Sequence, residues 1–186
     1  GIIYSYDKNI NNCSILDCYV NNCEILHDKA TDTKGSSAGI LAMTYGVKEI
    51  NIKNCEVNNS SVTSNIVENS SGYNMNVGGI IAFCGYTDNI EINNCDVKNT
   101  QINNNCYNRD SYANIAGIIA VAYKGWGSQI GITISNSNLI NSNLFTKSGN
   151  AGGIIAYADD NPTNTGKIVN CKVEKSTINS EAGKED

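Results

Sequence analysis

Side chains that could catalyse a reaction are few in this sequence and are poorly grouped. Asp159 and Asp160 are adjacent acids beside Pro162. Hydrolysis of a glycosidic bond needs two carboxylates about 5 to 10 Å apart that face the same substrate. Neighbouring residues of a strand point to opposite faces, so this pair is typical of a turn rather than of an active site.

His27 is the only histidine and Arg109 is the only arginine. We interpret His27 as a solvent-facing loop residue rather than a general base. Arg109 and Asp110 lie in a loop, with no partner acid at the same repeat position. Signatures of serine hydrolases, zinc proteases and P-loops are missing from the sequence. We therefore expect no enzyme activity, no cofactor and no metal site.

Aromatic side chains favour binding over catalysis. The chain has ten tyrosines, and one tryptophan, Trp126, stands between two glycines as in an exposed turn. Tyr45 and Tyr123 share one repeat position, and Tyr86 is one step away. These four residues are candidate contacts for sugar rings or partner side chains. Two alternatives stay open: the tyrosines end a packed strand, and Trp126 folds onto the flank of the molecule.

Four of the eight cysteines recur at one repeat position, and a serine fills that position in the fourth repeat. Residues stacked on adjacent strands lie about 4.8 Å apart with parallel Cβ directions, which is poor geometry for a disulfide. The pattern predicts a structural ladder of small, buried, reduced side chains, formed by Cys18, Cys55, Cys95, Ser137 and Cys171.

The other four cysteines follow the repeat less closely, so a disulfide among Cys13, Cys23, Cys84 and Cys106 stays open. There is no Cys-x-x-Cys motif, which argues against a zinc ribbon and a thioredoxin-like site.

Five internal repeats must position these side chains. Each repeat has a Gly-Ile-Ile/Leu anchor, a polar turn, and a tail related to Asn-Cys-x-Val. Successive anchors are 38, 40, 38 and 36 residues apart, a spacing typical of stacked repeat architectures. We predict one repeat array with units at 1–38, 39–78, 79–116, 117–152 and 153–186.

The third repeat shows how one unit folds. Its anchor, 79–84, is apolar at every position, which predicts a strand covered on both faces. In 90–92 the alternation places two isoleucines inside and Glu91 outside. We predict coils of three strands and two Asn corners, with Asn54, Asn94, Asn136 and Asn170 stacked in one structural column.

These features predict an all-β fold, a parallel β-solenoid of about five stacked coils with side loops. The crossover rule makes it right-handed, and a propeller is the alternative. The segments between tail and anchor vary in length. They cover 26–38, 63–78, 103–116 and 145–152. We expect them to fold over the outer face of the anchor strands.

Charge and hydropathy exclude two classes of partner. The net charge is −5 with a single arginine, which argues against nucleic acid. The longest apolar run, 116–123, is too short to span a bilayer, so we expect no membrane insertion in this segment. The sequence starts in mid-repeat without Met, so we expect a fragment or a processed chain.

The repeat resembles the GLUG motif, in which Gly-Gly-Leu-Val-Gly and a loop precede Ile-x-Asn-Cys/Ser. The resemblance covers nearly the whole chain, but alanine replaces the usual second glycine in four repeats and Tyr4 replaces it in the first, and the units are longer. It implies a bacterial protein that is secreted or on the cell surface, such as an adhesin or the stalk of a surface enzyme.

We therefore expect a non-enzymatic structural or adhesive module, a rigid spacer that presents loops to a host protein or glycan. The alternative is a subunit that assembles into filaments or surface layers, because both ends of the array finish in repeat-like strands that can pair with neighbouring repeats or copies. A fragment of a polysaccharide-active β-helix enzyme is the third and least favoured hypothesis.

Overall fold

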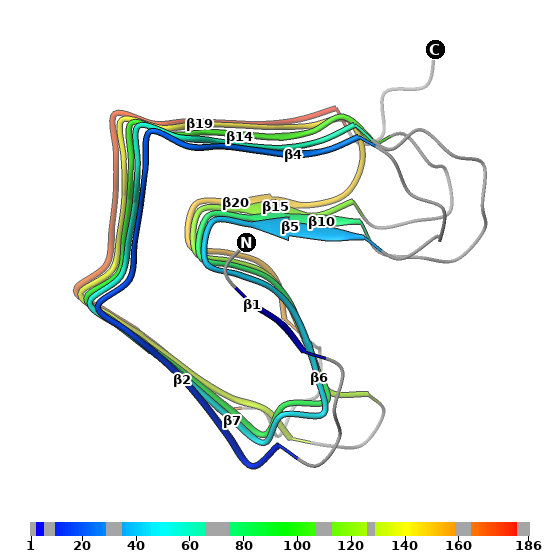
Figure 1. Cartoon of the computed structure of the whole chain (residues 1–186), viewed down its shortest axis with the longest axis vertical. Helices are drawn as coiled ribbons and strands as arrows, with labels where there is room; N and C mark the ends of the chain where they lie inside the picture. The colour runs from blue at the N-terminus through cyan, green and yellow to red at the C-terminus, as the bar shows by residue number, and fades with distance from the viewer. Residues whose placement is uncertain are drawn as a thin grey trace.

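The computed structural model describes residues 3–5, 10–28, 35–65, 75–106, 113–125, 129–158 and 165–181. In this part of the chain every regular element is a β-strand. The strands form five parallel sheets, and the chain visits each sheet once per coil (Figure 1). Four complete coils are followed by a fifth coil of four strands.

Sheets A and B hold the anchor strands and the strands that follow them. Sheet A comprises β1 (Ile3–Ser5), β6 (Leu41–Tyr45), β11 (Ile81–Gly85), β16 (Ile119–Tyr123) and β21 (Ile155–Ala158). Sheet B comprises β2 (Asn12–Leu16), β7 (Glu49–Lys53), β12 (Asn89–Asn93), β17 (Gly131–Ser135) and β22 (Thr165–Val169).

Sheets C and D continue the coil after two sharp corners, and sheet E closes it. Sheet C comprises β3 (Tyr19–Asn21), β8 (Glu56–Asn58), β13 (Asp96–Lys98), β18 (Asn138–Ile140) and β23 (Lys172–Glu174). Sheet D comprises β4 (Glu24–His27), β9 (Ser61–Ser64), β14 (Gln101–Asn104), β19 (Asn143–Thr146) and β24 (Thr177–Ser180). Sheet E comprises β5 (Ser36–Ala38), β10 (Asn76–Gly78), β15 (Ile115–Ala116) and β20 (Ala151–Gly152).

Every pair of neighbouring strands is parallel, and except for a register shift between β1 and β6 each pair joins equivalent residues of successive repeats. In sheet B, for example, Ile90 lies between Ile50 and Ile132. This register stacks each inward-facing side chain on its equivalent, so the isoleucines and valines of one coil bury those of the next. The predicted parallel β-solenoid is confirmed, and the parallel pairing excludes a propeller.

The coil has five strands, and the prediction of three was wrong. Each segment between tail and anchor forms one of the additional strands. This strand lies in sheet E rather than over the outer face of the anchor strands. Sheet E runs back beside sheet D (Figure 1), and Asn104 Nδ2 donates to the Met75 carbonyl oxygen at 2.7 Å between the two segments. Val77 and Ile115 of sheet E join the main core, which explains why these short segments fold inward.

Two anchor strands of the inner coils, β11 and β16, are buried on both faces, as predicted from their unbroken run of apolar residues. In β11, the neighbouring residues Ile81 and Ala82 are both inaccessible to solvent, and in β16 Ile119 and Ala120 are buried in the same way.

Two corners in each coil are made by residues in the left-handed backbone region. The first corner joins sheet B to sheet C, and the second joins sheet C to sheet D (Figure 1). Asn and Asp tolerate this conformation better than other side chains do. The left-handed residues are Asp17, Asn54, Asn94, Asn136 and Asn170 at the first corner, and Asn22, Asn59, Asn99, Asn141 and Lys175 at the second.

Candidate functional site

The first corner holds the five residues that we predicted to form a ladder. Each side chain directly follows the left-handed residue and donates a hydrogen bond to the backbone carbonyl two residues earlier. For the cysteines the distance from Sγ to this oxygen is 3.2 to 3.4 Å, and for the serine it is 2.8 Å. The ladder consists of Cys18, Cys55, Cys95, Ser137 and Cys171.

The thiols in the middle of this ladder have low reactivity. Burial raises the pKa of Cys55, and it raises the pKa of Cys95 to about 12. The thiol form therefore prevails at neutral pH, whereas the thiolate is the nucleophile and the metal ligand. The ladder therefore has a structural role at the first corner.

The second corner carries an equivalent ladder that we did not predict. Its residues also follow a left-handed residue and bond to the carbonyl two residues earlier. The distances are 2.7 to 2.9 Å for the hydroxyls and 3.3 Å for the thiol. A constant offset of five residues from the first ladder could have revealed it. Its members are Cys23, Ser60, Thr100, Ser142 and Ser176.

All eight cysteines lie in the described part of the chain, and none of them forms a disulfide there. Cys23 belongs to the second corner. Cys13 faces the main core, and Cys84 is fully buried, which raises its pKa to about 12. Cys106 lies in a small separate cluster with Met75 and Ala113.

Asparagine side chains link the coils outside the first corner. Asn54 Nδ2 donates to Asp17 Oδ1 at 3.0 Å, and Asn94 Nδ2 donates to Asn54 Oδ1 at 2.9 Å. Further along, Asn170 Nδ2 approaches Asn136 Oδ1 at 3.4 Å, while Asn136 bonds to Asn93 rather than Asn94. These bonds link Asp17, Asn54 and Asn94 in the first three coils and Asn136 and Asn170 in the last two, and the predicted column is interrupted between Asn94 and Asn136.

Three of the four candidate contact residues come together where sheet A turns into sheet B. The rings of Tyr45 and Tyr86 have centroids 4.7 Å apart, and those of Tyr86 and Tyr123 are 5.9 Å apart in an edge-on arrangement. Trp126 lies outside the described residues. We call these three side chains the tyrosine row.

Tyr86 owes its place in the row to an unusual backbone. Its φ is 55°, which is rare for an aromatic residue. Gly85 occupies the register position of Tyr45 and Tyr123, and a Cβ there would lie 2.6 Å from the Phe83 ring. The left-handed turn moves the third ring past this crowded position, and Tyr86 is 45% exposed.

Of the residues considered for catalysis, only His27 lies in the described part of the chain. His27 ends β4 and is half-buried, and burial lowers its pKa. Asp159, Asp160, Arg109 and Asp110 lie outside the described residues.

The described segments show neither a metal site nor a membrane-spanning helix. In them, no group of three or more His, Cys, Asp or Glu side chains is arranged to hold a metal ion. Across the same segments, no helix has the length and hydropathy needed to cross a membrane.

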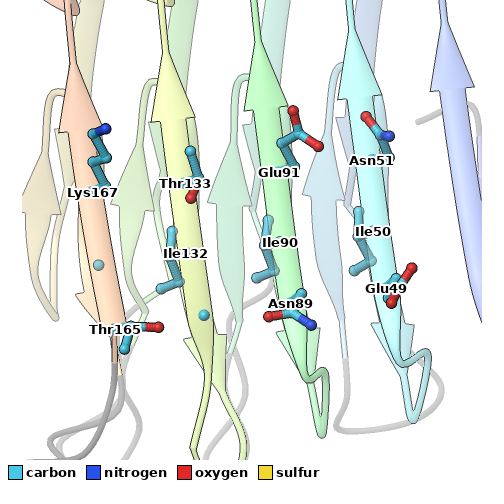
Figure 2. A pocket seen from close by; sticks show the side chains of 12 residues that line it. Glu49, Ile50, Asn51, Asn89, Ile90, Glu91, Ile132, Thr133, Thr165 and Lys167 are labelled. Atoms are coloured by element: carbon cyan, nitrogen blue, oxygen red, sulfur yellow. The ribbon is translucent and has the colours of Figure 1, made fainter.

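A polar concavity lies on the outer face of sheet B, and we call it the sheet B hollow. It has a volume of about 410 Å³. Figure 2 shows two rows of side chains along the sheet, one with Glu49, Asn89 and Thr165, the other with Asn51, Glu91, Thr133 and Lys167. Gly131 interrupts the first row between Asn89 and Thr165.

No family model, no curated protein and no solved structure matches the chain.

Proposed function

We propose that this protein is a non-enzymatic, GLUG-like repeat module of a secreted or cell-surface protein, and that it works as a rigid spacer that presents contact surfaces to proteins or glycans. One observation carries the proposal: the same side-chain-to-backbone hydrogen bond recurs at both corners of every described coil. A corner held the same way in each coil favours a stiff rod.

The tyrosine row supports the contact part of this proposal. Tyrosine offers a large ring face and a polar hydroxyl to a ligand. Lys124 and Asp88 form an ion pair in the same turn region, which adds a charged rim.

Small-angle X-ray scattering tests the spacer. A rigid rod predicts that the scattering profile calculated from the structure fits the data, and that it stays the same between 10 and roughly 40 °C, below any unfolding transition. A scattering profile that changes with temperature before circular dichroism shows any loss of β-structure would contradict the proposal.

End-to-end assembly is the second candidate function, and the last coil favours it. Ile168 and Val173 are 53% and 44% exposed, whereas their equivalents in the first coil, Ile15 and Val20, are 3% and 9% exposed. A further coil, from this chain or from another copy, would bury the exposed pair and add parallel hydrogen bonds.

Sedimentation velocity over a hundredfold concentration range, with and without reductant, separates the two functions. A spacer predicts a monomer throughout. Growth into long species that does not depend on reductant would favour assembly and count against the spacer as the main role.

A further inference from the structure

The outer face of sheet B carries a polar hollow, and its lining includes no residue of either corner. Its polar lining side chains point away from the core, and most of them are exposed. Gly131 is the centre of this hollow because its missing side chain leaves a gap in an otherwise continuous row. Figure 2 shows the polar groups that flank the gap, from four successive coils.

Two polar groups flank the gap. A Cβ built on Gly131 would lie 2.5 Å from Asn89 Oδ1 and 3.5 Å from Thr165 Oγ1. A ligand hydroxyl that lies above Gly131, in van der Waals contact with its backbone, can donate to the amide oxygen of Asn89 and accept from the hydroxyl of Thr165. Two flanking groups of complementary kind therefore meet one bound oxygen.

The second row extends the same chemistry. Asn51 Oδ1 is buried and has no hydrogen-bond partner within the described residues, so a ligand hydroxyl would reach it only after rotation of the Asn51 side chain. Glu91 Oε1 forms an ion pair with Lys53 Nζ at 3.1 Å, and the other carboxylate oxygen of Glu91 can accept a hydrogen bond from a ligand. Thr133 and Lys167 supply donors in the adjacent coils.

The charges argue against an ionic ligand. Glu49 and Glu91 on neighbouring strands repel an anion, while Lys53 and Lys167 reduce the attraction for a cation. A peptide strand cannot add here, because the strands of sheet B already pair with each other and present side chains on this face. A neutral molecule with several hydroxyl groups and a flat C–H face matches the amides, hydroxyls and exposed backbone.

We propose that the sheet B hollow binds a neutral saccharide, with one ring seated over Gly131 and its hydroxyls bonded to Asn89 and Thr165. The site rests on the proposed function, since it specifies the glycan contact of the spacer. It is separate from the tyrosine row, so the two can be tested independently.

The test is isothermal titration calorimetry of the whole chain. The probes are short oligosaccharides of β-linked glucose, mannose and N-acetylglucosamine, and a galacturonate oligosaccharide as the acidic comparison. Gly131→Thr fills the gap on an outward strand position, where the nearest obstacle is the movable end of the Asn89 side chain. Ser135→Ala is the matched control, because Ser135 lies at an outward-facing position of the same strand, β17, and does not line the hollow.

The proposal predicts that a neutral probe binds, that Gly131→Thr weakens binding at least tenfold, and that Ser135→Ala leaves it unchanged. Asn89→Ala keeps the gap and loses the acceptor, so it should also weaken binding severalfold. Tighter binding of galacturonate, or no binding of any neutral probe, would overturn the inference. Loss of binding in Tyr86→Ala but not in Gly131→Thr would also overturn it, and would place the glycan contact at the tyrosine row without harming the spacer.

Discussion

The two corners of the coil solve the same backbone problem with different atoms. At the first corner, thiols in four of five coils bond to the carbonyl two residues earlier, and at the second corner hydroxyls do so in four of five. The hydroxyls gain a second bond. Ser142 Oγ, for example, accepts from the backbone N–H of Thr100 in the preceding coil at 3.1 Å.

The thiols make a weaker link between coils. Cys95 Sγ reaches the Ile52 carbonyl of the preceding coil at 3.5 Å, and Cys55 Sγ reaches the Ile15 carbonyl at 3.7 Å. Where serine replaces cysteine, at Ser137, the stronger pattern returns: its Oγ accepts from the N–H of Cys95 at 3.1 Å. A left-handed residue and a small polar donor therefore define the corner, while the choice of sulfur or oxygen sets how firmly coils are joined.

Replacing the left-handed residue should have the largest effect, and it should be the same at both corners. Asn94→Val and Asn99→Val each force a β-branched residue into the left-handed region, which is the main cost at both corners; the first also removes one exposed amide hydrogen bond and the second removes two. We expect each to lower the free energy of unfolding by about 3 kcal/mol, measured by urea denaturation.

The matched glycine variants separate these two causes. Asn94→Gly and Asn99→Gly accept the left-handed conformation and lose only the side-chain bonds, so we expect a loss of about 1 kcal/mol. Equal losses for glycine and valine would show that the backbone conformation does not define the corners.

Removing the hydroxyl at the second corner should cost more than removing the thiol at the first. Ser142→Ala leaves the N–H of Thr100 without its acceptor, and we expect it to lower the free energy of unfolding by about 2 kcal/mol. Cys95→Ala loses weaker sulfur contacts, and we expect about 1 kcal/mol. A larger loss of unfolding free energy for Cys95→Ala than for Ser142→Ala, measured by urea denaturation, would contradict the proposed difference between the corners.

Alkaline pH should weaken the first corner more than the second, because four of its five ladder residues are cysteines. Burial raises the pKa of Cys95 from 9.0 in the unfolded chain to about 12, so the thiol contributes stability that is complete below pH 9 and is lost as pH rises toward 12. At pH 10 the unfolded chain gains about 1.4 kcal/mol from ionisation of this thiol.

Cys95→Ser should therefore reduce the fall in stability between pH 8 and pH 10, measured by urea denaturation at both values. Thr100→Ser is the matched control at the second corner, where no thiol is present in that coil, and it should leave the pH dependence unchanged. Part of the pH dependence of stability remains in both variants, because burial also raises the pKa of the Cys84 thiol to about 12. An unchanged slope in Cys95→Ser would contradict the role of burial at this thiol.

The smallest effect should come from exchanging the two chemistries. Cys95→Ser places at the third coil the residue that the fourth coil already has, so at pH 7 we expect a change below about 1 kcal/mol. A larger loss would mean that the first corner requires the volume of sulfur.

Repetition made the solenoid predictable from sequence. Anchors and tails recur in constant order, and that order alone makes Cys55 and Cys95 equivalent positions of adjacent coils. The strands of sheet E could not be predicted in this way, because they are two or three residues long and share only a final Ala or Gly before the anchor glycine. Val77 and Ile115 become recognisable as core residues only after sheet D is placed beside them.

The candidate sites were predictable to different degrees. The shared position of Tyr45 and Tyr123 suggested the tyrosine row, but the left-handed turn that brings Tyr86 between them depends on crowding at Gly85. The sheet B hollow was invisible in the sequence, since Asn89, Gly131 and Thr165 become neighbours only through the register of three coils.

Stacking of successive repeats in parallel register through these corners is best tested by NMR, with scalar couplings measured across backbone hydrogen bonds in isotope-labelled protein. The structure predicts a coupling between the Asp96 amide nitrogen and the Cys55 carbonyl carbon, where the N···O distance is 3.0 Å, and another between Asn138 and Cys95 at 3.1 Å. Observation of both couplings would establish the stack, whereas a coupling of the Asp96 amide to a carbonyl within its own repeat would contradict it.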